Sequence, residues 1–105
     1  KAMAEFKKVA RVEDIPIGKV KGFEVGYDKI VICNTGEGIY AVIDECTHES
    51  WPLSTGKLKG NILICPHHGA RFDVTTGAVT HAPAIVPVQT YEVKVENGEI
   101  FVKLD

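Results

Sequence analysis

The fold class is decided by one C-terminal stretch, residues 91–104, with the sequence YEVKVENGEIFVKL. Apolar residues stand at every second position on both sides of Asn97-Gly98, which is the period of a strand that buries one face. Asn-Gly is a strongly favoured two-residue hairpin turn, because both of its central residues must take a positive φ. The stretch therefore predicts an antiparallel hairpin.

The rest of the chain is typical of further short strands. Ten glycines and five prolines cut it into short apolar pieces, which suits a many-stranded β domain. The strands predicted before the hairpin are residues 6–10, 20–25, 29–34, 39–44 and 62–65. The first of these also has helical spacing, and its neighbours favour the strand interpretation. We expect an all-β domain of antiparallel sheets packed as a β-sandwich, with residues 1–105 forming one domain.

Composition excludes several classes of function. The 105 residues are 45% hydrophobic and 25% charged, as in soluble globular proteins. A net charge of −2 argues against a nucleic-acid-binding protein. The longest apolar run, residues 39–43, is far shorter than the roughly 20 residues of a membrane span. No signal-peptide pattern opens the chain and the three cysteines are an odd number, so we expect a cytoplasmic protein without a disulfide framework.

Two short motifs carry the chemistry, Cys46-Thr47-His48 and Cys65-Pro66-His67-His68-Gly69. Thiolate and imidazole are ligands of zinc and of iron–sulfur clusters. A zinc finger usually pairs Cys with Cys and His with His, whereas each motif here mixes the two. Mixed motifs fit a [2Fe–2S] centre in which two His replace two Cys on one iron. The spacing alone allows either His67 or His68 to coordinate the metal.

The region that holds both motifs, about residues 45–75, differs from the rest of the chain. It contains two of the three cysteines, three of the four histidines and the single tryptophan. We expect a loop-built, cluster-binding subdomain inserted into the β scaffold.

With these motifs, the chain resembles the Rieske-type [2Fe–2S] ferredoxins. The resemblance extends to the connecting segment Pro52-Leu53-Ser54-x-Gly56-x-Leu58-x-Gly60 and to Gly69-Ala70-Arg71-Phe72-Asp73. It implies one [2Fe–2S] cluster. Its ligands would be Cys46 and Cys65 on one iron and His48 and His68 on the other, since the family's ligand His directly precedes the Gly.

The chain departs from the high-potential members of that family at four positions. Those members have an additional Cys in each cluster loop, joined by a disulfide, where this chain has Trp51 and His67. They also have a Ser and a Tyr that hydrogen-bond cluster sulfurs, where this chain has Ala70 and Phe72. Hydrogen bonds to the sulfurs raise the reduction potential. The resemblance therefore implies a low-potential member, at roughly −150 mV.

The same resemblance implies an electron carrier and not an enzyme. Such carriers pass single electrons from an NAD(P)H-dependent flavin reductase to a terminal oxygenase, so two redox proteins are the expected partners of a monomer. Three alternatives stay open: the small subunit of an assimilatory nitrite reductase, a zinc-binding structural module and a detached domain of an oxygenase α-subunit.

Several other residues have a predicted place. Docking is expected around the outer edges of His48 and His68, with four residues near the contact: Glu45, Glu49, Trp51 and His67. Cys33 lies in an apolar run and is expected to be a buried structural thiol. His81 is expected to be a solvated loop histidine.

Overall fold

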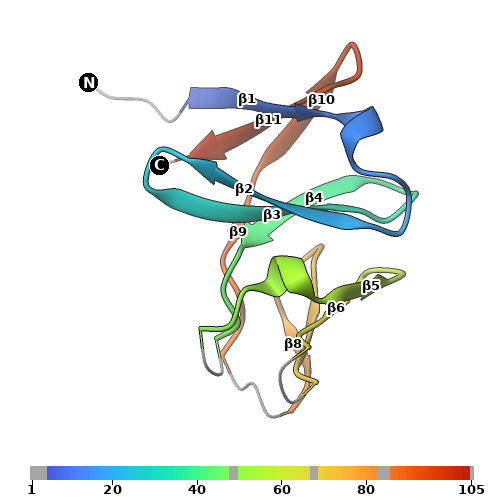
Figure 1. The fold of residues 1–105 in the computed structure, drawn as a ribbon, viewed down its shortest axis with the longest axis vertical. Coiled ribbons are helices and arrows are strands. Elements are labelled where there is room, and N and C mark those ends of the chain that lie inside the picture. Colours follow the sequence, from blue (N-terminus) through green and yellow to red (C-terminus); the bar gives the residue numbers. More distant parts are fainter. Residues whose placement is uncertain (1–4, 48–49, 67–68, 83–85, 105) are drawn as a thin grey trace.

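The structure is a computed structural model that describes residues 5–47, 50–66, 69–82 and 86–104. Strands make up most of these residues (Figure 1). These residues form eleven strands and two short 3-10 helices. In chain order they are β1 (Glu5–Arg11), η1 (Val12–Asp14), β2 (Val20–Val25), β3 (Asp28–Asn34), β4 (Ile39–Ile43), η2 (Leu53–Thr55), β5 (Lys57–Lys59), β6 (Ile62–Ile64), β7 (Arg71–Asp73), β8 (Val79–His81), β9 (Thr90–Tyr91), β10 (Val93–Glu96) and β11 (Glu99–Leu104).

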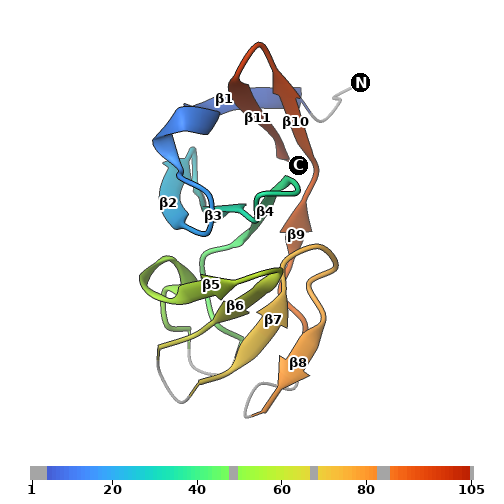
Figure 2. The same ribbon diagram turned by 90° about the vertical axis from the view of Figure 1, so that its right-hand side faces the viewer.

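The strands form three antiparallel sheets, which confirms the predicted all-β class. Their orders are β1-β11-β10, β2-β3-β4-β9 and β5-β6-β7-β8. The first two sheets lie together at one end of the molecule and the third lies at the other end (Figures 1 and 2). The sheet β2-β3-β4-β9 is therefore the middle layer, and it supports the part of the chain that carries both Cys-His motifs.

Strand β3 shows how the middle layer is built. Ile30 and Ile32 are buried with Ile100 and Val102 of the outer sheet. The alternate residues Val31 and Cys33 are buried with residues of the third sheet. Because both faces are covered, β3 is a continuous apolar run instead of an alternating one.

The C-terminal hairpin forms as predicted, with positive φ values of 53° at Asn97 and 76° at Gly98. The strand before the turn differs from the prediction, because Glu92 interrupts it. Tyr91 pairs with Ala41 of β4, whereas β10 pairs with β11. The chain therefore crosses from the middle sheet to the outer sheet at Glu92, which the apolar alternation of residues 91–95 did not reveal.

The inserted part contains more strand than the sequence indicated. Of the four strands in the third sheet, only β6 was predicted, and β8 lies beyond residue 75, the predicted end of the inserted part. The strands β5, β6, β7 and β8 have three residues each and pair with their chain neighbours. Three residues are too few to show a period of two, so neither pattern nor length marks them in the sequence.

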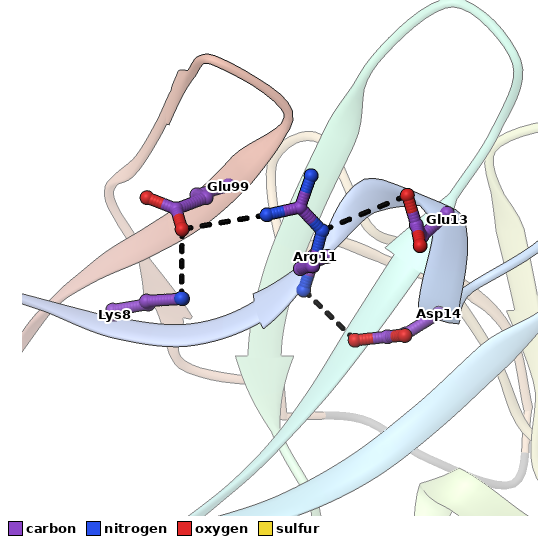
Figure 3. A network of polar contacts seen from close by, with 5 residues as sticks. All are labelled: Lys8, Arg11, Glu13, Asp14 and Glu99. Atoms are coloured by element: carbon purple, nitrogen blue, oxygen red, sulfur yellow. Dashed lines mark hydrogen bonds and ion pairs between the residues drawn. The ribbon is translucent and has the colours of Figure 1, made fainter.

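An exposed ion-pair network joins β1 to β11 far from the third sheet (Figure 3). Lys8 Nζ lies 2.7 Å from Glu99 Oε2, and Arg11 Nη1 lies 3.5 Å from the same oxygen. The hydrogen bond from Lys8, and next the charge of Lys8, lower the pKa of Glu99. Arg11 also contacts Glu13 at 3.6 Å, and its amide N–H donates to Asp14 at 2.9 Å. Exposed pairs of this kind contribute little to stability.

Among the described residues, no helix is long and apolar enough to cross a membrane.

Candidate metal centre

Cys46 opens a tight loop just after β4. Cys46 is buried, with 1% of its surface exposed. The Cys46 amide donates to the Trp51 carbonyl at 2.7 Å, and the Ser50 amide donates to the Cys46 carbonyl at 2.7 Å. Ser50 takes a positive φ of 57°, which is uncommon for a residue other than glycine. These bonds join the two ends of residues 46–51, which we call the first cluster loop.

Cys65 opens a second loop of the same design directly after β6. It is also 1% exposed, and its amide donates to the Ala70 carbonyl at 2.8 Å. Gly69 takes a positive φ of 72°, at the position that Ser50 has in the first loop. In both loops the Cys amide bonds the carbonyl five residues later. The Cys65 amide therefore joins the two ends of residues 65–70, the second cluster loop, as the Cys46 amide joins the ends of the first.

The two cysteines belong to one buried apolar cluster. It also contains Cys33 from β3, Phe72 from β7 and further apolar residues from η2, β4, β6 and the segment before β9. Two thiols in one core, carried on two similar loops, are a donor set that fits an iron–sulfur cluster. The other predicted ligands, His48 and His68, lie outside the described residues, as do Glu49 and His67.

A third segment is fastened to the first cluster loop. Thr47 Oγ1 donates to the Val86 carbonyl at 2.6 Å. Two residues later, the Val88 amide donates to the Gly77 carbonyl at 2.9 Å. Gly77 has a positive φ of 82°, and a Cβ there would collide with the Val88 carbonyl oxygen. Residues 86–88 are thus held between the first cluster loop and the turn after β7.

The segment that connects the two loops packs tightly against β6. A Cβ on Gly56 would collide with the carbonyl oxygen of Ile64, the residue before Cys65. Since Gly56 has an ordinary φ of −85°, space and not backbone conformation requires a glycine there. The sequence indicated Gly56 only as part of the family resemblance, and the steric requirement for glycine at this position was not predicted.

The remaining predicted residues are found in different surroundings. Ala70 and Phe72 are fully buried, while Glu45 is exposed and 44% of Trp51 is exposed. His81 is exposed as predicted, but it ends strand β8, opposite Arg71, instead of lying in a loop.

Cys33 is a buried thiol, as predicted, with no measurable exposed surface. Burial, and secondarily the negative charge of Asp44, raise the pKa of Cys33 from 9.0 to about 12. The thiol is therefore neutral at physiological pH, which fits a packing role.

Comparison with known proteins agrees with this description. The Rieske [2Fe–2S] domain family matches residues 5–92. The ferredoxin component of biphenyl 2,3-dioxygenase from Rhodococcus jostii is 37% identical over 98 residues, covering 93% of this chain and 92% of that protein.

Two solved structures are also similar. The ferredoxin of carbazole 1,9a-dioxygenase from Nocardioides aromaticivorans has a TM-score of 0.89 at 33% identity, over 94% of this chain and 97% of that one. A complex of reduced oxygenase and oxidized ferredoxin in carbazole 1,9a-dioxygenase contains a chain with a TM-score of 0.87 at 35% identity. That match covers 93% of this chain and 92% of the other.

The chain therefore belongs to the Rieske [2Fe–2S] domain family. Its cofactor is one [2Fe–2S] cluster, and the two buried thiols fit that cofactor.

Proposed function

We propose that this protein takes single electrons from an NAD(P)H-dependent flavin reductase and delivers them to a terminal oxygenase. The observation that carries the proposal is the near full-length match to ferredoxin components of dioxygenase systems. In one similar structure the ferredoxin is in a complex with its oxygenase. These relatives favour an oxygenase system over the small subunit of a nitrite reductase.

The ligand set we propose is Cys46 and Cys65 on one iron and His48 and His68 on the other. The two described cysteines support it, because each is buried and each opens one of two matching loops. Two neutral imidazoles in place of two thiolates leave the cluster about two charge units less negative. The cluster supplies reversible uptake of one electron, and the two loops keep its sulfur ligands in an apolar core.

We also propose that the reduction potential is low for this family. The side chains of Ala70 and Phe72 carry no hydroxyl, and both residues are fully buried in the core that holds Cys46 and Cys65. At these positions the high-potential relatives place their donors to cluster sulfurs. Without those donors the reduced, more negative state is stabilised less.

The docking surface we propose surrounds the first cluster loop. Trp51 and Val86 expose 44% and 52% of their surfaces. Glu45, the residue directly before Cys46, is also exposed. The bond from Thr47 to Val86 brings the segment of Val86 to this loop. Interfaces between proteins commonly combine an apolar core with a polar rim.

A reductive titration followed by reoxidation tests the function. Under anaerobic conditions the purified protein should take up one electron per chain. When the reduced protein is mixed with oxidised biphenyl 2,3-dioxygenase, it should transfer that electron to the oxygenase. The rate of this transfer should be lower for Trp51→Ala than for the wild type. Uptake of no electron, or of two, would contradict a one-electron carrier. A rate unchanged in Trp51→Ala would remove this docking surface from the proposal.

Variants at the two adjacent histidines test the ligand set. His68→Ala should lose or alter the cluster spectrum, whereas His67→Ala should keep it. The reverse pattern would show that His67 is the ligand.

A further inference from the structure

Asp44 lies two residues before Cys46 and joins two parts of the cluster-binding region. Its amide donates to the Lys29 carbonyl at 2.9 Å, which extends the pairing of β3 with β4. Its carboxylate Oδ1 accepts the Ser54 amide N–H at 2.6 Å. Ser54 belongs to η2, in the segment that leads from the first cluster loop to the second. One carboxylate therefore ties the entry of the first loop to its exit.

Strand β2 leaves room for this contact at Gly22. A Cβ on Gly22 would lie 2.8 Å from Asp44 Oδ2 and 2.9 Å from Ser54 Cβ. A real Cβ atom essentially never lies within 3.0 Å of atoms such as these, so any larger residue at Gly22 would displace the carboxylate or η2. Asp44 is thus enclosed by three segments of the chain and is only partly exposed.

We propose that Asp44 is a positioning residue for the first cluster loop and that its negative charge lowers the reduction potential of the cluster. The inference rests on the proposed role of Cys46 as a ligand. It goes beyond that role by naming a residue outside the ligand set that sets the potential.

The charge of Asp44 already acts on the core that holds the cysteines. Cys33 shares its buried cluster with Cys46 and Cys65, and the charge of Asp44 is a cause of its raised pKa, second to burial. Deprotonating a thiol and reducing the cluster both add negative charge to this core. A carboxylate that opposes the first opposes the second in the same way.

Two positively charged residues near Asp44 oppose the effect of its carboxylate on the reduction potential, but only weakly. Lys21 and Lys29 line the same open groove as Asp44, but both side chains are exposed. Water and salt screen exposed charges more strongly than partly buried ones. Glu45 is adjacent to Asp44 in sequence and one residue closer to Cys46, but it is exposed, so its effect is expected to be smaller.

The test compares Asp44→Asn with Glu45→Gln in the cluster-loaded protein. Each substitution removes one negative charge, and Asn keeps an oxygen that can accept the Ser54 amide. Protein-film voltammetry gives the midpoint potential, and EPR of the reduced state reports the cluster geometry. Asp44→Asn should raise the equilibrium constant for reduction about three- to tenfold, which for one electron is about 28–59 mV. Glu45→Gln should change it by less than twofold.

A shift in Asp44→Asn no larger than that in Glu45→Gln, with an intact EPR signal, overturns the inference and leaves the proposed function standing. Absence of a [2Fe–2S] signal from the wild type would instead refute the proposed function. If Asp44→Asn assembles no cluster, Asp44→Glu and Asp44→Gln provide the same charge comparison. The glutamate variant should then have the lower midpoint potential, and equal potentials contradict the inference.

Discussion

Phe72→Tyr adds one hydroxyl to the buried core around the two cysteines. Phe72 has no exposed surface, lies opposite Leu63 of β6 and follows Ala70 by two residues. The family resemblance places a donor to a cluster sulfur at this position. A hydroxyl that donates to a sulfur stabilises the reduced state more than the oxidised state, so the midpoint potential should rise.

The magnitude follows from the energy of such a bond. A hydrogen bond to a charged group contributes about 1.5–3 kcal/mol. If about half of that is specific to the reduced state, the shift is about 30–60 mV, since 59 mV is a tenfold change for one electron. Voltammetry of the wild type and Phe72→Tyr measures it. Phe101→Tyr, in β11 of the outer sheet, is the matched control and should leave the potential unchanged.

Stability provides a second readout for the same variant. A buried hydroxyl that finds no partner costs about 1–3 kcal/mol. If the hydroxyl reaches a sulfur, the potential rises while the free energy of unfolding stays close to that of the wild type. An unchanged potential together with a loss of stability in this range would refute the reasoning, because the hydroxyl would then be buried without an acceptor.

Two further predictions concern the glycine before β5 and the buried thiol of β3. Gly56→Ala should lower the free energy of unfolding by about 1–3 kcal/mol and reduce the iron content, because its Cβ would collide with the Ile64 carbonyl beside Cys65. Gly60→Ala is the control, because Gly60 has a φ of 58° and no atom within 4 Å of an added Cβ. It should cost only about 1–2 kcal/mol of backbone strain and keep its iron. Urea unfolding and iron analysis measure both variants, and a greater loss of iron in Gly60→Ala than in Gly56→Ala would contradict the steric argument. Cys33 should resist iodoacetamide at pH 9 in the folded protein and react in guanidinium, because burial raises its pKa to about 12. Between pH 9 and 12 the thiol ionises in the unfolded protein while it stays protonated in the folded protein. The free energy of unfolding of the wild type should therefore fall relative to that of Cys33→Val as the pH rises. A difference between the two that does not change with pH would contradict the assigned pKa.

The sequence contained enough information for the sheets that form the scaffold. Residues 20–25 and 29–34 are short runs separated by the turn residues Gly26-Tyr27, and Asn97-Gly98 can form the observed turn at little conformational cost. The crossing at Glu92 was not predictable in this way, because the local alternation of residues 91–95 is the same whether they pair with one sheet or with two. Only the competing partners, β4 and β11, decide where the strand is divided.

The candidate site was predictable to the extent that residue types and spacing reveal chemistry. Cys46 and Cys65 stand in motifs that only metal or cluster binding explains well, and both were found in one buried core. The supporting contacts were not predictable. Asp44 and Gly22 are ordinary residues in sequence, and their relation exists only after η2 packs onto β2.

EPR of the dithionite-reduced protein, together with iron and acid-labile sulfide analysis, tests the central claim most directly. The claim predicts about two irons and two sulfides per chain. It also predicts a rhombic signal whose average g value lies below that of clusters held by four cysteines. A colourless protein with one zinc per chain, or a signal of the four-cysteine type, would contradict it.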